Sequence, residues 1–172
     1  AAFLRRAAEL TPEEARRSGR ALAAAQATLQ AGALDDADRL VTTAESGVLN
    51  EHEQAKAALL RAQISFLSTR GSDATRQLLS AAERLGELDP ELARETYLEA
   101  VTAAIFAGPL AGSGATSPEV ARAAKAAPPA PRAPRGLDLL LDGLVALLTD
   151  SYGAAVPILR ETQRALGDGM SP

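Results

Sequence analysis

Residues 22–44, LAAAQATLQAGALDDADRLVTTA, decide the fold, because their pattern returns 37 positions later in residues 59–81, LLRAQISFLSTRGSDATRQLLSA. Six positions carry the same or a similar side chain in both stretches: Leu22 and Leu59, Ala25 and Ala62, Gln26 and Gln63, Leu29 and Phe66, Ala37 and Ala74, and Ala44 and Ala81. A period of about 20 to 50 residues is typical of proteins that stack one supersecondary unit on the next. The chain is therefore predicted to consist of repeats.

The pattern continues toward the C-terminus. A shift of 76 positions places Thr102 on Gln26, and a shift of 118 positions places Gly143 on Ala25. Four repeats follow from these matches, at approximately 13–50, 51–88, 89–127 and 136–168, with a leading half-repeat at 1–12 and a Pro-rich connector at 128–135. We expect residues 1–172 to form a single domain.

The composition favours helices over strands. Apolar residues make up 47% of the chain but aromatic residues only 3%, so alanine and leucine must supply the buried surface. These two residues lead the ranking of helix propensity, and strands prefer β-branched and aromatic side chains. The fold class predicted is all-α.

Small residues recur twelve positions apart within the repeats, as Ala25 and Ala37 do, and again Gly143 and Ala155. Small side chains at facing positions let two antiparallel helices approach closely. The pattern resembles the tetratricopeptide repeat, with turns at 32–34 and 150–152 where that repeat has its Gly and aromatic residue. The resemblance implies an α-solenoid of helix-turn-helix repeats.

Capping signals mark several helix boundaries. Thr11-Pro12-Glu13-Glu14 is typical of a helix start, and this helix is predicted to run to about Ala31. The sequence 89–91, Asp-Pro-Glu, predicts a second start of the same kind. Residues 108–118 are rich in Gly, Ser and Ala, and a short helix is predicted at 118–127 between this loop and the connector.

Charge and composition argue against several classes of partner. The net charge of −4 and the pI near 5.1 disfavour a nucleic-acid-binding surface, which usually carries a basic face. The chain has no cysteine, so neither a disulfide framework nor a thiolate metal site is expected. The most apolar run, residues 137–148, is shorter than the roughly 20 residues that span a membrane. We expect a cytoplasmic protein without a membrane segment.

Two residue clusters suggest chemistry, but their spacing does not support it. His52, the only histidine, is flanked by Glu51 and Glu53, and neighbours one position apart on a helix point to different faces. A solvated helix start is the expected role of this cluster. The glycines at 108, 112 and 114 lack the Gly-Lys-Ser/Thr of a phosphate-binding loop, so we interpret them as a flexible turn.

Positive charge gathers locally at Arg122, Lys125, Arg132 and Arg135. No aromatic residues are interleaved for stacking on bases, so we interpret this run as a solvated linker. No nucleophile with an adjacent base is apparent anywhere in the sequence. We expect no enzymatic activity, no metal and no cofactor in this chain.

The inner helices of the predicted solenoid supply the candidate binding site. One position of the repeat is occupied by Gln26, Gln63 and Thr102, and Leu22, Leu59 and Gln30 belong to the same stripe. Such a polar ladder can hydrogen-bond an extended peptide or a small-molecule effector in the concave groove. The alternative is that these side chains face water and contact nothing.

Two phrases resemble a more specific family. Residues 88–100, LDPELARETYLEA, and 139–160, LLLDGLVALLTDSYGAAVPILR, look like the middle region of the large ATP-dependent LuxR-type transcriptional regulators of actinobacteria. The resemblance implies a parent protein with an ATPase domain, a tetratricopeptide-like sensor region and a DNA-binding helix-turn-helix. This chain carries neither a phosphate-binding loop nor a recognition helix, so ATP and DNA are expected to bind elsewhere in the parent.

The sequence thus predicts a module that binds a protein, peptide or small effector for a transcriptional regulator, and self-association stays open. A freestanding tetratricopeptide scaffold or co-chaperone is the alternative. Co-chaperones of this type that clamp a peptide carboxylate carry Lys and Arg on their inner helices. This chain has Gln, Thr and Leu there, so the alternative ranks lower.

Overall fold

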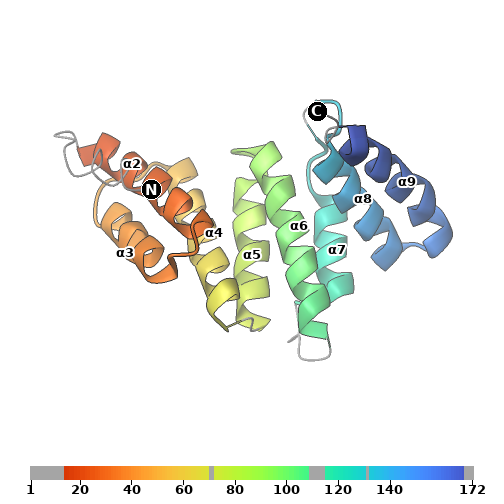
Figure 1. Cartoon of the computed structure of the whole chain (residues 1–172), viewed down its shortest axis with the longest axis horizontal. Coiled ribbons are helices and arrows are strands. Elements are labelled where there is room, and N and C mark those ends of the chain that lie inside the picture. Colours follow the sequence, from red (N-terminus) through yellow and green to blue (C-terminus); the bar gives the residue numbers. More distant parts are fainter. Residues whose placement is uncertain (1–13, 70–71, 109–114, 131, 169–172) are drawn as a thin grey trace. The chain divides into compact units, whose positions relative to one another are not determined.

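A computed structural model of the chain describes residues 14–69, 72–108, 115–130 and 132–168. These residues form eight helices and no strand, so the prediction of an all-α fold is confirmed for them (Figure 1). The chain divides into two compact units, Ala1–Arg70 and Gly71–Pro172. The half-repeat predicted at 1–12, the predicted cap at Thr11 and the glycines at 112 and 114 lie outside the described residues.

Helices α2 (Glu14–Gln30), α3 (Leu34–Glu45) and α4 (Glu51–Thr69) make up the described part of the first unit. The predicted turn after α2 is confirmed, because Gly32 adopts a positive φ of 79°. Glycine adopts this left-handed conformation without the strain of a Cβ atom. The backbone N–H of Gly32 donates to Leu29 O at 2.9 Å, and that of Ala33 donates to Thr28 O at 3.1 Å. These bonds end α2 and turn the chain back into α3.

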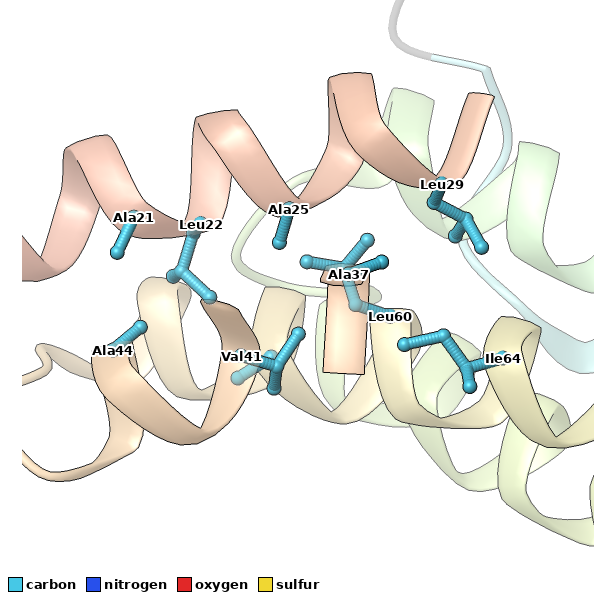
Figure 2. Packing of buried hydrophobic residues seen from close by; sticks show 10 residues of the cluster. Ala21, Leu22, Ala25, Leu29, Ala37, Val41, Ala44, Leu60 and Ile64 are labelled. Atoms are coloured by element: carbon cyan, nitrogen blue, oxygen red, sulfur yellow. The ribbon is translucent and has the colours of Figure 1, made fainter. Parts of the chain in front are cut away.

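The core of the first unit lies where α2 faces α3 and α4 (Figure 2). Ala25 and Ala37 are both fully buried in it, as expected for small residues at a close approach of two helices. The cluster consists of Ala21, Leu22, Ala25, Leu29, Ala37, Val41, Ala44, Ala57, Leu60 and Ile64. The alanines allow the helices to approach closely, and leucine and isoleucine side chains fill the remaining space between them.

An ion-pair cluster joins α3 to α4 at the edge of this core. Arg61 of α4 donates from Nη2 to Glu45 Oε2 at 2.8 Å and from Nη1 to the carboxylate of Asp38. The hydrogen bond to Glu45 and then that to Asp38 outweigh burial, so the pKa of Arg61 is raised. All three side chains are partly exposed, so water screens the attraction and the stabilisation is modest.

The second unit contains α5 (Ser72–Leu85), α6 (Pro90–Ala107), α7 (Ser117–Ala126), α8 (Gly136–Thr149) and α9 (Tyr152–Asp168). Helices α5 and α6 pack together, as do α8 and α9, and α6, α7 and α8 contact one another (Figure 1). Asp89 caps α6 as predicted, because its carboxylate accepts from Leu92 N at 3.2 Å and Pro90 follows at the first helical position. The short helix predicted at 118–127 is confirmed by α7.

Glycines in α8 bring α9 close. A Cβ atom added to Gly143 would lie 2.5 Å from Leu159 Cδ2, and one added to Gly136 would lie 2.5 Å from Leu166 Cδ2. The prediction that a small residue at 143 serves helix approach is therefore confirmed. The repeat predicted at 51–88 contains α4 of the first unit and α5 of the second, so it spans the boundary between the two units.

Candidate functional site

The six residues predicted to line a groove are distributed over both units. Leu22 and Leu59 are buried, with exposed fractions of 5% and 4%, and offer almost no surface to a ligand. Gln26 and Gln63 are partly exposed, on α2 and α4, and Gln30 is exposed near the end of α2. Thr102 belongs to the second unit, where its hydroxyl donates to Leu98 O at 2.8 Å. Within the first unit, Gln26, Gln30 and Gln63 therefore offer polar side chains to solvent, whereas Leu22 and Leu59 belong to the core.

A cleft of about 540 Å³ lies within the second unit, and we call it the main cleft. It is bounded by α6, α7, the connector, α8 and the beginning of α9. Its apolar lining comes from Ala124, Ala127, Pro129, Ala130, Pro134, Val145, Ala146 and Ile158, and its charged lining from Arg94, Lys125, Arg132, Asp142 and Asp150. Binding sites for small molecules have this character, with apolar walls and a few placed polar groups.

Arg94 is the most buried charged residue of the main cleft, with an exposed fraction of 6%. Its Nε donates to Asp138 Oδ1 at 2.9 Å, and its Nη2 donates to Asp142 Oδ1 at 2.6 Å and to Asp138 O at 3.2 Å. A buried guanidinium is costly unless its charge is balanced and its donors are satisfied. The two aspartates of α8 balance the charge and accept from Nε and Nη2, and thereby fix α8 against α6.

Asp138 connects this pair to the start of α8. Its Oδ2 accepts from Arg135 N at 2.9 Å and from Arg135 Nε at 3.0 Å, so the carboxylate caps the first turn of the helix. Arg135 Nη1 in turn donates to Glu95 Oε1 at 2.8 Å, one residue after Arg94 on α6. A continuous chain of ion pairs therefore runs from α6 through the end of the connector into α8.

The electrostatic state of Asp138 follows from two opposing effects. Burial alone would raise the pKa of its carboxyl group, since the side chain is only 4% exposed. Hydrogen bonds from Arg135 and Arg94 outweigh burial, and the pKa of Asp138 lies below its ordinary value. The carboxylate is thus held ionised between two guanidinium groups.

The remaining charged groups of the main cleft are more exposed. Lys125 Nζ lies 2.6 Å from Asp150 Oδ1 and lowers the pKa of that carboxyl group. Arg132 Nη1 lies 3.6 Å from Glu91 Oε1, and its side chain is 84% exposed. Lys125 and Arg135 are partly exposed, as expected of a solvated run, but the interpretation did not foresee their ion pairs, with Asp150 in the turn after α8 and with Glu95 of α6.

A second, smaller cleft of about 220 Å³ shares Ala130 and Arg132 with the main cleft. Its other lining residues are Glu91, Ala133, Arg135 and Asp138. The Pro-rich connector therefore forms a wall of both clefts. The ion pairs of Arg135 with Glu95 and Asp138 hold the C-terminal end of that wall.

His52 lies at the second position of α4 and is partly exposed, as expected of a helix start. Among the described residues, no group of three or more histidine, aspartate or glutamate side chains is arranged to hold a metal ion. None of the described helices combines the length and the hydropathy that crossing a membrane requires.

The sequence contained one signal for the main cleft. Asp138 and Asp142 interrupt an otherwise apolar run and lie four positions apart, which places them on one face of a helix. Two acids on one face of an apolar helix require a basic partner, but the pattern does not say which. Arg94, 44 positions before Asp138, supplies it.

Comparisons of the chain with protein-family models, with curated proteins and with solved structures find no match.

Proposed function

We propose that the chain is a non-enzymatic helical-repeat module that binds an effector or a protein partner within a LuxR-type transcriptional regulator. The observation that carries the binding role is the main cleft. Its volume of about 540 Å³ lies within the range of about 300 to 1,000 Å³ that is common for small-molecule sites. The resemblance of residues 88–100 and 139–160 to the middle region of these regulators supplies the regulatory part of the proposal.

The contacts of the main cleft suit binding that is coupled to a change in conformation. Residues from four helices and the connector line it, so a ligand seated there touches elements that are distant in sequence. A ligand shifts a protein between two states only by the difference in its affinity for them. In this proposal the helix pairs continue as a tetratricopeptide-like solenoid, and occupation of the cleft changes how the connector packs.

The binding role is tested by thermal-shift measurements on the chain with sugars, nucleotides, amino acids and short peptides. A ligand present at 100 times its Kd stabilises the fold by about 2.7 kcal/mol, which raises the Tm measurably. Ala130→Leu narrows the main cleft from the connector without removing an ion pair, and should abolish the shift. Gln63→Ala should leave it unchanged, because Gln63 belongs to the first unit.

The opposite result, with the shift lost in Gln63→Ala and kept in Ala130→Leu, would return the site to the groove expected from the sequence. A chain that no compound of the four classes stabilises would contradict the effector-binding role. The regulatory part is tested on the reading frame of the parent protein. A recognition helix downstream supports the regulator, and a stop codon directly after residue 172 supports the freestanding scaffold.

A further inference from the structure

We propose, on the basis of the function proposed above, that the main cleft binds a free α-amino acid with an apolar side chain, in its zwitterionic form. Two opposite charges in contact on the cleft wall carry this inference. Arg94 and Asp142 both line the cleft, and Arg94 Nη2 lies 2.6 Å from Asp142 Oδ1. A free amino acid carries an ammonium and a carboxylate on the same carbon, so its two charges lie as close together as those of this pair.

Both members of the pair retain hydrogen-bonding capacity. Nε and Nη2 of Arg94 are occupied by Asp138 and Asp142, whereas Nη1 makes no hydrogen bond to any residue that the structure describes. Asp142 uses Oδ1 for Arg94, and within the same described residues its Oδ2 accepts no hydrogen bond. A guanidinium donates strongly to a carboxylate, and a carboxylate accepts strongly from an ammonium. The ligand carboxylate is therefore assigned to Arg94 and its ammonium to Asp142.

Ligands with a single charge fit this wall less well. An anion that approaches Arg94 meets the carboxylate of Asp142, and a cation that approaches Asp142 meets the guanidinium of Arg94. Each therefore gains one attraction and suffers one repulsion at short range. Lys125 and Asp150 repeat the arrangement on the same cleft, with 2.6 Å between Nζ and Oδ1. Only a ligand with both charges is complementary to such pairs.

The rest of the lining determines the side chain that the ligand carries. Val145, Ala146 and Ile158 of α8 and α9 face the cleft together with prolines 129 and 134 of the connector. This surface offers no hydrogen-bonding side chains, and burial of a branched aliphatic group against it is favourable. The structure therefore favours a branched aliphatic amino acid over a polar one.

The test is a calorimetric titration of the whole chain with L-leucine and two analogues that each lack one charge. 4-Methylpentanoate keeps the carboxylate and the aliphatic chain, and 3-methylbutan-1-amine keeps the ammonium and the aliphatic chain. L-Leucine should bind saturably, and each analogue should bind at least tenfold more weakly, because one charge-assisted hydrogen bond is missing. Binding of either analogue with an affinity similar to that of L-leucine would overturn the proposal.

Substitutions separate the cleft from other surfaces. Asp142→Asn keeps an acceptor for Arg94 but removes the charge, and should weaken L-leucine at least tenfold while 4-methylpentanoate is not weakened. Asp73→Asn is the matched control, because Asp73 is exposed in the same unit and does not line the cleft, and it should leave both affinities unchanged. Equal binding of L-leucine by wild type and Asp142→Asn would contradict the assignment.

If Asp142→Asn does not fold, Ala130→Leu still tests the proposal. This second variant blocks the same cleft from the connector side and should also abolish L-leucine binding. The outcome also separates the two proposals. If L-leucine does not bind but a sugar, nucleotide or peptide binds in the main cleft, the proposed function is supported and the amino-acid proposal is refuted. If no compound of any class binds, both fall.

Discussion

At the scale of single residues, Arg94 is, with Asp138, one of the two charged residues that are buried in the part of the chain that the structure describes. It is 6% exposed and lies in a helix whose other buried residues are mostly alanine, valine and tyrosine. A buried ion pair often adds little net stability over a well-packed apolar pair, but removal of one partner leaves the other charge uncompensated. A substitution that removes one charge of this ion pair should therefore lower the stability of the fold by a large amount.

Asp138→Asn tests this directly. The substitution keeps the shape and an acceptor for Arg135 N but removes a charge that faces two guanidinium groups, and we expect a loss of about 3 to 5 kcal/mol in the free energy of unfolding. Urea denaturation near neutral pH measures the change. Asp73→Asn, at an exposed ion pair, should change stability by no more than about 0.5 kcal/mol. Similar losses in both variants would contradict the buried role of Asp138.

The same comparison has a defined pH dependence. Because the pKa of Asp138 is lowered in the folded chain, its ion pairs stabilise the fold fully above the pKa of an unfolded aspartate, about 3.9, and this contribution is lost as the pH falls through the folded pKa. The difference in stability between wild type and Asp138→Asn should therefore be constant near neutral pH and shrink progressively below about pH 4. A difference in stability between the two proteins that grows on acidification would contradict the lowered pKa of Asp138.

At the scale of elements, helix pairs depend on how closely their backbones approach. In α8 and α9 this approach is set by Gly136 and Gly143, whose missing Cβ atoms leave room for Leu166 and Leu159. Glycine within a helix costs about 1 kcal/mol relative to alanine. The close packing must offset that cost, so a substitution by alanine sets the two effects against each other.

Gly143→Ala should destabilise the chain relative to Gly167→Ala. Alanine at 143 gains about 1 kcal/mol of helix propensity, but its Cβ lies 2.5 Å from Leu159 Cδ2 and 2.9 Å from Cγ, and overpacking costs about 1 to 3 kcal/mol. At Gly167 an added Cβ meets no atom within 4 Å, so only the propensity changes. Thermal unfolding of both variants measures the difference. If both variants were stabilised equally, α9 would move away from α8 without a loss in packing, and the predicted overpacking at position 143 would be absent.

The sequence predicts these elements better than it predicts the site. Local signals such as Asp89-Pro90 and the glycine at 32 mark helix ends to within about a residue, because capping and turn chemistry act over three or four positions. The partner of Arg94 is not local. Which of the many acidic residues meets it depends on how α6 and α8 pack, and periodicity does not specify that.

The same limit explains why the ion pairs of Lys125 and Arg135 were not predicted. Each pairs with an acidic residue that is distant in sequence: Lys125 with Asp150, in the turn after α8, and Arg135 with Glu95 of α6. The groove residues illustrate a related limit. The repeat identified Leu22 and Leu59 as equivalent positions, and both turn out to be buried, so they serve the core rather than an open surface.

At the scale of the whole molecule, the chain divides into two compact units. Leu60 is buried with α2 and α3 in the first unit, and Leu141 is fully buried in the second. Contiguous parts of a protein can open separately, each with its own free energy. Damage to one core should therefore be visible first in its own unit.

Leu60→Ala and Leu141→Ala form a reciprocal pair that tests this expectation by amide hydrogen exchange. Each removes a large buried side chain and should cost about 2 to 5 kcal/mol. Leu60→Ala should accelerate exchange in residues 14–69 more than in 72–168, and Leu141→Ala should do the reverse. Uniform acceleration across the chain in both variants would indicate a single cooperative unit instead.

The 44 positions between Arg94 and Asp138 also have a consequence for synthesis on the ribosome. Helix α6 leaves the exit tunnel well before α8, so for that interval its guanidinium has no counter-charge from α8 and must keep its hydration. The nascent second unit can desolvate this face of α6 only when the first turn of α8 has emerged. Closure of so long a loop costs more chain entropy than local contacts do, and we expect this step to follow the formation of the local contacts within α6.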